Sequence, residues 1–161
     1  MIEKVLAGLG AGILVATLPA CGMIDPETLK PGITTGHEVR ERMGAPAMEW
    51  QEADGARTWE YPRTPEGIEN YMIVIGPDNI LREVRQVLTA ENFARVAPGM
   101  RRDEVRRLLG KPAHEFYFPL KKEHVWDWKT PSEPGMDRFF NVHFDEGGTV
   151  VRTSTNNVQR G

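Results

Sequence analysis

Hydrophobic and polar residues are unevenly distributed along this chain. Residues 5–24 carry no charge and read VLAGLGAGILVATLPACGMI, whereas charged and apolar residues are interleaved from Asp25 onward. A run of about 20 apolar residues is long enough to cross a bilayer, but this one contains four glycines and a proline. Lys4 precedes the run and small residues end it, which is typical of a secretory signal peptide. The pattern predicts a removable export segment followed by a folded body.

An internal repeat organises the rest of the chain. Four short motifs occur twice, in the same order, at a spacing of 67 or 66 residues. They are Pro31-Gly32 and Pro98-Gly99, Glu38-Val39-Arg40 and Glu104-Val105-Arg106, Gly44-Ala45-Pro46 and Gly110-Lys111-Pro112, and Trp59-Glu60-Tyr61 and Trp126-Asp127-Trp128. We therefore predict two tandem units, residues 31–95 and 96–161.

Each unit contains a helical pattern followed by strand-like sequence. Val105, Leu108 and Leu109 follow the spacing of one helix face, and Gly110 suits the left-handed conformation that ends a helix. Shorter helical stretches are predicted at residues 26–30 and 90–96. Strand-like sequence follows each helix, at residues 59–61, 71–75 and 80–84 in the first unit and 115–120, 124–129, 138–144 and 149–154 in the second. The expected fold class is α+β: two tandem helix–helix–three-stranded antiparallel sheet units.

The export segment ends in Leu18-Pro19-Ala20-Cys21, which resembles the lipobox of bacterial lipoproteins. The resemblance implies a signal peptide at residues 1–20, acylation of Cys21 and a short tether over residues 21–30. Several acyl chains at one residue hold a protein on a bilayer far better than a single chain. Because Gly22 rather than Asp follows, the analogy with lipoprotein sorting favours a lipid anchor in the outer membrane, facing the periplasm. The alternatives are a plain signal peptide with an incidental cysteine and an uncleaved anchor.

The order of the repeated motifs, with Phe144-Asp145-Glu146-Gly147-Gly148 near the end of the second unit, resembles the SmpA/OmlA (BamE-like) family of outer-membrane lipoproteins. The resemblance is strongest across residues 96–155 and weaker in the first unit. It implies a non-catalytic interaction module in outer-membrane protein assembly or envelope integrity, with barrel-assembly machinery subunits as partners. The tandem units are also similar, at the level of fold, to the β-lactamase inhibitory proteins. That second resemblance implies the alternative of a periplasmic inhibitor or ligand-binding protein.

Catalytic and metal-binding chemistry is poorly represented in the sequence. The four histidines, His37, His114, His124 and His143, lack the spacing of a metal site, and no nucleotide or cofactor motif occurs. His124 and His143 lie in strand-like segments where they could approach each other. The acids Glu49, Glu52 and Asp54 are interpreted as solvated. We therefore expect neither an enzyme nor a bound metal or cofactor.

Charge is divided unequally between the two units. The net charge of the whole chain is −3, which does not favour nucleic acid as a partner. Residues 31–97 carry −4 and residues 98–161 carry +2. Much of the positive charge lies on one predicted helix and its cap, at Arg101, Arg102, Arg106, Arg107 and Lys111. This cluster is either a solvated helix face or a candidate interface with anionic lipid headgroups or an acidic protein.

A second candidate interface is the aromatic stretch at residues 116–120. A strand that alternates about a core buries one face only, so Tyr117 or its neighbours could remain exposed. Exposed aromatic side chains anchor many protein interfaces. The alternative is that these residues belong to the core.

Overall fold

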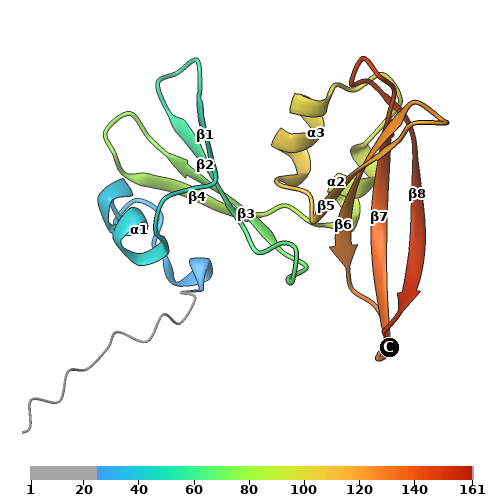
Figure 1. The fold of residues 1–161 in the computed structure, drawn as a ribbon. Coiled ribbons are helices and arrows are strands. Elements are labelled where there is room, and N and C mark those ends of the chain that lie inside the picture. Colours follow the sequence, from blue (N-terminus) through green and yellow to red (C-terminus); the bar gives the residue numbers. More distant parts are fainter. Residues whose placement is uncertain (1–24, 161) are drawn as a thin grey trace, which may run out of the picture.

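The computed structural model describes residues 25–160 and contains two four-stranded antiparallel sheets with short helices before each (Figure 1). The first part consists of the 3-10 helix η1 (Pro26–Thr28), α1 (Gly36–Met43), β1 (Met48–Gln51), β2 (Arg57–Pro62), β3 (Asn70–Ile75) and β4 (Leu81–Gln86). The second part consists of α2 (Ala90–Arg95), α3 (Arg102–Leu109), β5 (His114–Phe118), β6 (Glu123–Thr130), β7 (Met136–Phe144) and β8 (Val150–Gln159). In both sheets the strands lie in the order of the sequence, each paired with the next.

The expected α+β class of two helix–helix–three-stranded units is wrong, because the molecule is mostly β and each sheet has four strands. The strand that was not expected is β1, at the edge of the first sheet. In the second unit the strand-like residues 115–120 overlap the edge strand β5, but the expected unit counted only three strands. None of the four residues of β1 is buried, so this strand lacks the alternating burial of a half-buried strand; all five residues of β5 are exposed as well. Backbone pairing to β2 and β6 holds these strands in place. The helix expected at residues 26–30 is only the three-residue η1.

Two predictions for the amino-terminal segment lie outside the described residues. These are the signal peptide at residues 1–20 and the acylated Cys21. Within residues 25–160, no helix is long and apolar enough to span a membrane. The anchor therefore stays a prediction.

The repeated sequence motifs fix the ends of the two longer helices. Ahead of α1, the backbone N–H of Thr35 donates to the carboxylate of Glu38 (2.8 Å), and ahead of α3 the N–H of Arg101 donates to Glu104 (2.7 Å). This contact satisfies a backbone donor that a helix start leaves free. A glycine with positive φ follows each helix, Gly44 after α1 and Gly110 (φ 74°) after α3.

Each sheet packs one face against its own helices. In the first sheet this face forms a core with Trp59, Ile73 and Val39 at its centre, and in the second it forms a core around Trp128 and Phe144. Trp128 also donates its indole N–H to the carbonyl of Gly110 at the end of α3 (3.1 Å). The two tryptophans of β6 thus face the helices, as the alternating pattern predicts.

The parts of the molecule follow one another as layers: α1, the first sheet, α3 and the second sheet (Figure 1). Glu60 and Met72 point away from the core of the first sheet, yet they are 0% and 1% exposed. Polar contacts join Glu60 to Arg106 on α3. Helix α3 therefore packs its apolar side on its own sheet and turns a polar side toward the first sheet.

Candidate functional site

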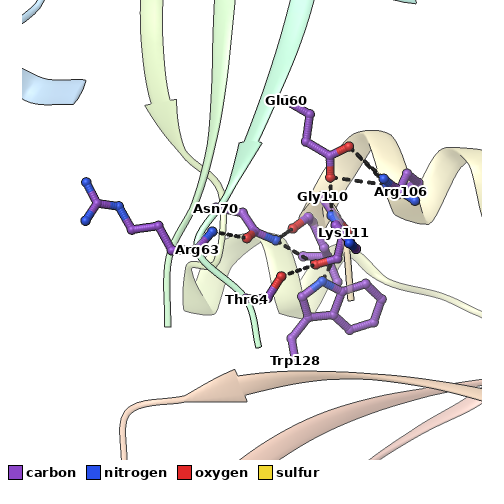
Figure 2. A network of polar contacts seen from close by, with 9 residues as sticks. Glu60, Arg63, Thr64, Asn70, Arg106, Gly110, Lys111 and Trp128 are labelled. Atoms are coloured by element: carbon purple, nitrogen blue, oxygen red, sulfur yellow. Dashed lines mark hydrogen bonds and ion pairs between the residues drawn. The ribbon is translucent and has the colours of Figure 1, made fainter. Parts of the chain in front are cut away.

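The contact between α3 and the first sheet centres on Glu60. Arg106 donates to both of its carboxylate oxygens, with Nε at 3.2 Å from each and Nη2 at 2.9 Å from Oε2. The backbone N–H of Lys111 also donates to Oε1 of Glu60. Figure 2 shows these donors gathered around the carboxylate. A buried charge with this many partners is the arrangement that offsets its loss of hydration.

Asn70 holds the end of α3 from the neighbouring strand. Its amide nitrogen donates to the carbonyls of Leu109 and Lys111, both at 2.9 Å, and the hydroxyl of Thr64 donates to Lys111 at 3.2 Å (Figure 2). A Cβ atom at Gly110 would lie 2.8 Å from the Asn70 amide nitrogen. Glycine is therefore required at this point both for its φ and for the close approach of the two parts.

A third contact involves Arg107, which pairs with Glu52 at 3.1 Å and lies over the ring of Trp50 at 5.3 Å. The nearby acids were interpreted as solvated. The side chains of Glu52 and Glu49 are 34% and 41% exposed, and each also pairs with an arginine, Glu49 with Arg40. The sequence shows no sign of the pair between Arg107 and Glu52, because these residues are more than 50 positions apart.

The five basic residues of the candidate interface do not form one patch. Arg106 and Arg107 face the first sheet, where Lys111 contributes backbone groups. Arg102 lies over Phe144 at 5.5 Å, and Arg101 is exposed beside Asp103. A role for this cluster in binding lipid headgroups or an acidic protein stays a prediction.

The face of the second sheet that points away from α3 contains a groove of about 530 Å³. We call this surface the open face. Phe116 and Phe118, at its edge on β5, are each 46% exposed. Val125 and Asp127 of β6 lie deeper and are 5% and 6% exposed. The groove therefore has aromatic side chains at its rim and a carboxylate among its deeper residues.

Asp127 is held by a single neighbouring residue. The backbone N–H of His114 donates to Oδ1 at 3.0 Å, and the His114 ring Nδ1 lies 3.0 Å from the same oxygen. Burial raises the pKa of Asp127, and the contacts with His114 only partly oppose this effect. The His114 side chain is 46% exposed, so a partner can reach it from solvent.

A second polar cluster on the open face surrounds His143. Its Nδ1 lies 3.0 Å from Glu123, and its Nε2 lies 2.8 Å from the hydroxyl of Ser154 and 3.0 Å from Nη1 of Arg152. The chain of Ser154, His143 and Glu123 has the connectivity of a serine-hydrolase triad. However, burial and then the charge of Arg152 lower the pKa of His143. Proton uptake beside a guanidinium is unfavourable, which makes His143 a poor general base.

His124 and His143 do not meet, contrary to the expectation. His143 pairs with Val125, the neighbour of His124, and successive residues of a strand point to opposite faces. The ring of His124 instead stacks near Tyr117, with centroids 4.5 Å apart. Within residues 25–160, no group of three or more potential ligands could hold a metal ion.

Tyr117 is 48% exposed, as the alternating pattern allowed, and its place in an interface stays a prediction. Phe116 and Phe118 belong to the aromatic stretch that was expected as a candidate interface, whereas Asp127 was not expected to be a functional residue. The repeat contained one signal for Asp127, since it corresponds to Glu60 in the motif shared by the two units. This correspondence indicates a functional role for Asp127 only once the contact between Glu60 and Arg106 is known.

Comparisons with known proteins give two similar structures. One is a DUF4309 family protein (YjgB) from Bacillus subtilis subsp. subtilis str. 168, with 13% identity, a TM-score of 0.33 and coverage of 83% of this chain and 84% of that chain. The other is a "putative beta-lactamase inhibitor protein" from Streptococcus mutans, with 11% identity, a TM-score of 0.31 and coverage of 76% and 82%. Superpositions at this level carry no inference of function. No protein-family model and no curated protein matches the chain.

Proposed function

We propose that this protein is a non-catalytic binding protein that docks a polypeptide on the open face of its second sheet. The observation that carries this proposal is a contrast between two corresponding faces. In the first sheet, α3 covers the face that contains Glu60. In the second sheet, the corresponding face has a groove of about 530 Å³ with half-exposed Phe116 and Phe118 at its edge.

The chemistry of the groove suits a protein partner. Interfaces between proteins combine aromatic anchors with surrounding polar groups that hydrogen-bond at the rim. Phe116, Phe118 and Phe139 supply aromatic surface, and Asn141 and His143 supply polar groups beside it. Because Arg152 opposes protonation of His143, the same cluster is poorly suited to general-base catalysis.

The cellular setting is a further part of the proposal and rests on the sequence. The lipobox and the resemblance to the SmpA/OmlA family support an acylated Cys21 that anchors the protein in the outer membrane, facing the periplasm. Barrel-assembly machinery subunits are the partners that this resemblance implies. The alternative is a periplasmic inhibitor or ligand-binding protein. The open face supports that alternative more directly, because a groove on a sheet is the feature such a protein requires.

Site-specific photo-crosslinking tests the binding role. Phe116 is replaced by p-benzoylphenylalanine in the full chain, and the protein is irradiated in intact native cells. We expect a discrete adduct with another protein at position 116. The matched control is Ile33, an exposed apolar residue of the first part of the chain, where no adduct is expected. Equal labelling at both positions, or none at position 116, would refute the proposal.

Cell fractionation of a Cys21→Ala variant tests the anchor. We expect the variant to leave the membrane fraction while the wild-type protein remains there. A variant that stays fully membrane-bound would show that acylation of Cys21 is not the anchor. Identification of the adduct at position 116 then decides between an assembly subunit and a soluble target.

A further inference from the structure

We infer that the open face binds the end of a short amphipathic helix that brings one cationic side chain to Asp127. This inference rests on the proposed binding function and specifies the chemistry of the partner. Its basis is that the same chain already shows a helix docked on the corresponding face of its first sheet. That contact serves as a template for binding at the open face.

The template consists of one ion pair within a helix–sheet contact. The buried carboxylate of Glu60 receives the guanidinium of Arg106, which lies one turn before the end of α3. The backbone at the helix end then reaches the sheet through Asn70. Arg107 covers Trp50 beside it. A helix end, a cation and an aromatic residue on the sheet are thus brought together.

The strand registers place Asp127 where the template has Glu60. Met48 pairs with Glu60 in the first sheet, and His114 pairs with Asp127 in the second. The backbone N–H groups of Ala47 and Ala113 donate to the carbonyls of Glu60 and Asp127, both at 2.8 Å. The two carboxylates therefore have the same position in their sheets and point to the same face.

The two faces differ in the groups around the carboxylate. By register, Trp50 corresponds to Phe116 and Asn70 to Phe139, and by spacing in the sequence Glu52 corresponds to Phe118. In the first part of the chain Asn70 binds the end of the helix, and Trp50 and Glu52 contact Arg107. Phenylalanines stand at all three corresponding positions of the second part. A helix suited to the open face carries apolar residues beside its cation, whereas α3 carries a second arginine.

His114 contacts Asp127 in the second sheet, as Arg106 contacts Glu60 in the first. It is the residue that contacts the Asp127 side chain, and its own side chain is about half exposed. An arginine or lysine from a partner would displace the imidazole and give the buried carboxylate a permanent counter-charge. Helices that lie in apolar grooves are a common mode of peptide recognition.

A synthetic peptide tests the inference. The probe has the sequence of residues 99–113 with Arg107→Leu, and a hydrocarbon staple between positions 104 and 108 maintains the helix, which a peptide of this length does not form stably in water. It presents Arg106 beside apolar side chains. Binding to the folded chain is measured by fluorescence anisotropy, and the contact surface by NMR chemical-shift changes. We expect saturable binding with shifts centred on Phe116, Phe118 and Asp127.

Charge removal on each side identifies the ion pair. Asp127→Asn in the protein is expected to weaken binding at least about tenfold, and Arg106→Leu in the peptide to do the same. When both changes are combined, the affinity should fall little further than with either change alone, because both remove the same ion pair. Glu115→Gln is the matched control, because Glu115 neighbours His114 on the same strand and points to the opposite face. Circular dichroism confirms that both variants are folded.

Several results would overturn the inference. They are the absence of binding, binding that Asp127→Asn leaves unchanged, and shifts located at Glu60 rather than at Asp127. Self-association of the chain that is abolished by Phe116→Ser would show that a second copy occupies the face. Adducts at position 116 without binding of the peptide would refute the inference that the partner is a helix with a cationic side chain, while leaving the proposed binding function intact. If neither the adduct nor peptide binding is observed, both the inference and the proposed function are refuted.

Discussion

The ion pair between Arg106 and Glu60 makes a quantitative prediction about how the two parts of the molecule are held together. Arg106→Ala removes the guanidinium but leaves the Glu60 carboxylate, which is 0% exposed. Removing one partner of a buried pair costs about 3–5 kcal/mol. The Arg106 side chain is 20% exposed, so water can enter, and the Lys111 N–H still donates to Glu60. We therefore expect the free energy of unfolding to fall by about 3 kcal/mol, near the lower end of this range.

Urea unfolding followed by tryptophan fluorescence measures this loss. With an m-value of about 2 kcal/mol/M, the midpoint should fall by about 1.5 M. Arg107→Ala is the matched control from the next position on the same helix. The pair of Arg107 with Glu52 is 45% and 34% exposed, and an exposed pair contributes at most about 1 kcal/mol.

A double variant separates the buried charge from lost packing. Glu60→Gln removes the charge that Arg106→Ala leaves unpaired, so the double variant should be more stable than Arg106→Ala alone. The reasoning is refuted if Arg106→Ala costs no more than Arg107→Ala, or if Glu60→Gln gives no recovery. In either case the ion pair would not be what holds α3 against the first sheet.

Two further predictions concern a helix end and the polar cluster. Gly110→Ala should lower the free energy of unfolding, measured by calorimetry, by about 2–3 kcal/mol. The reason is that the φ of Gly110 is 74° and the new Cβ would lie 2.8 Å from the Asn70 amide nitrogen. In the control Gly44→Ala the new Cβ meets nothing within 4 Å, and the loss should be about 1 kcal/mol. The pKa of His143 is lowered from 6.5, so the unfolded chain binds more protons below this pH and stability should decline as pH falls from 6.5 toward the folded-state pKa. His143→Gln should remove that decline in urea titrations at a series of pH values.

Each of these predictions has a distinct contrary result. Equal losses for Gly110→Ala and Gly44→Ala would show that contact with Asn70 does not matter. A decline in stability that persists in His143→Gln would assign it to another group. The contact with His143 holds the pKa of Glu123 below its usual value of 4.5, so the stability that Glu123 contributes is lost as pH falls below about 4.5.

The sequence predicted the repeated local structure but not the edge strand of the first sheet. Val105 and Gly110 define the core face and the end of α3 through spacing and backbone preference, which are local properties. Strand β1 was not predicted, because pairing with β2 holds it in place and none of its residues is buried. The number of strands per sheet was therefore wrong while the helix bounds were approximately right.

The candidate site divides in the same way. The shared motif identified Glu60 and Asp127 as corresponding residues, and the aromatic stretch of β5 was recognised before its position was known. The sequence did not show that Arg106 pairs with Glu60, 46 residues away, rather than facing solvent or lipid. A charge on a helix surface has the same local pattern in either case.

The sequence by itself determined the repeat, the helix ends and the alternating faces of the strands, because each depends on residues within a few positions of one another. Only the tertiary structure decided that α3 covers the outer face of the first sheet and that the corresponding face of the second sheet is open. The physical reason is that burial of a face depends on which distant element packs against it. Two units with matching motifs therefore have different surroundings: Glu60 meets an arginine of α3, and Asp127 meets a half-exposed histidine.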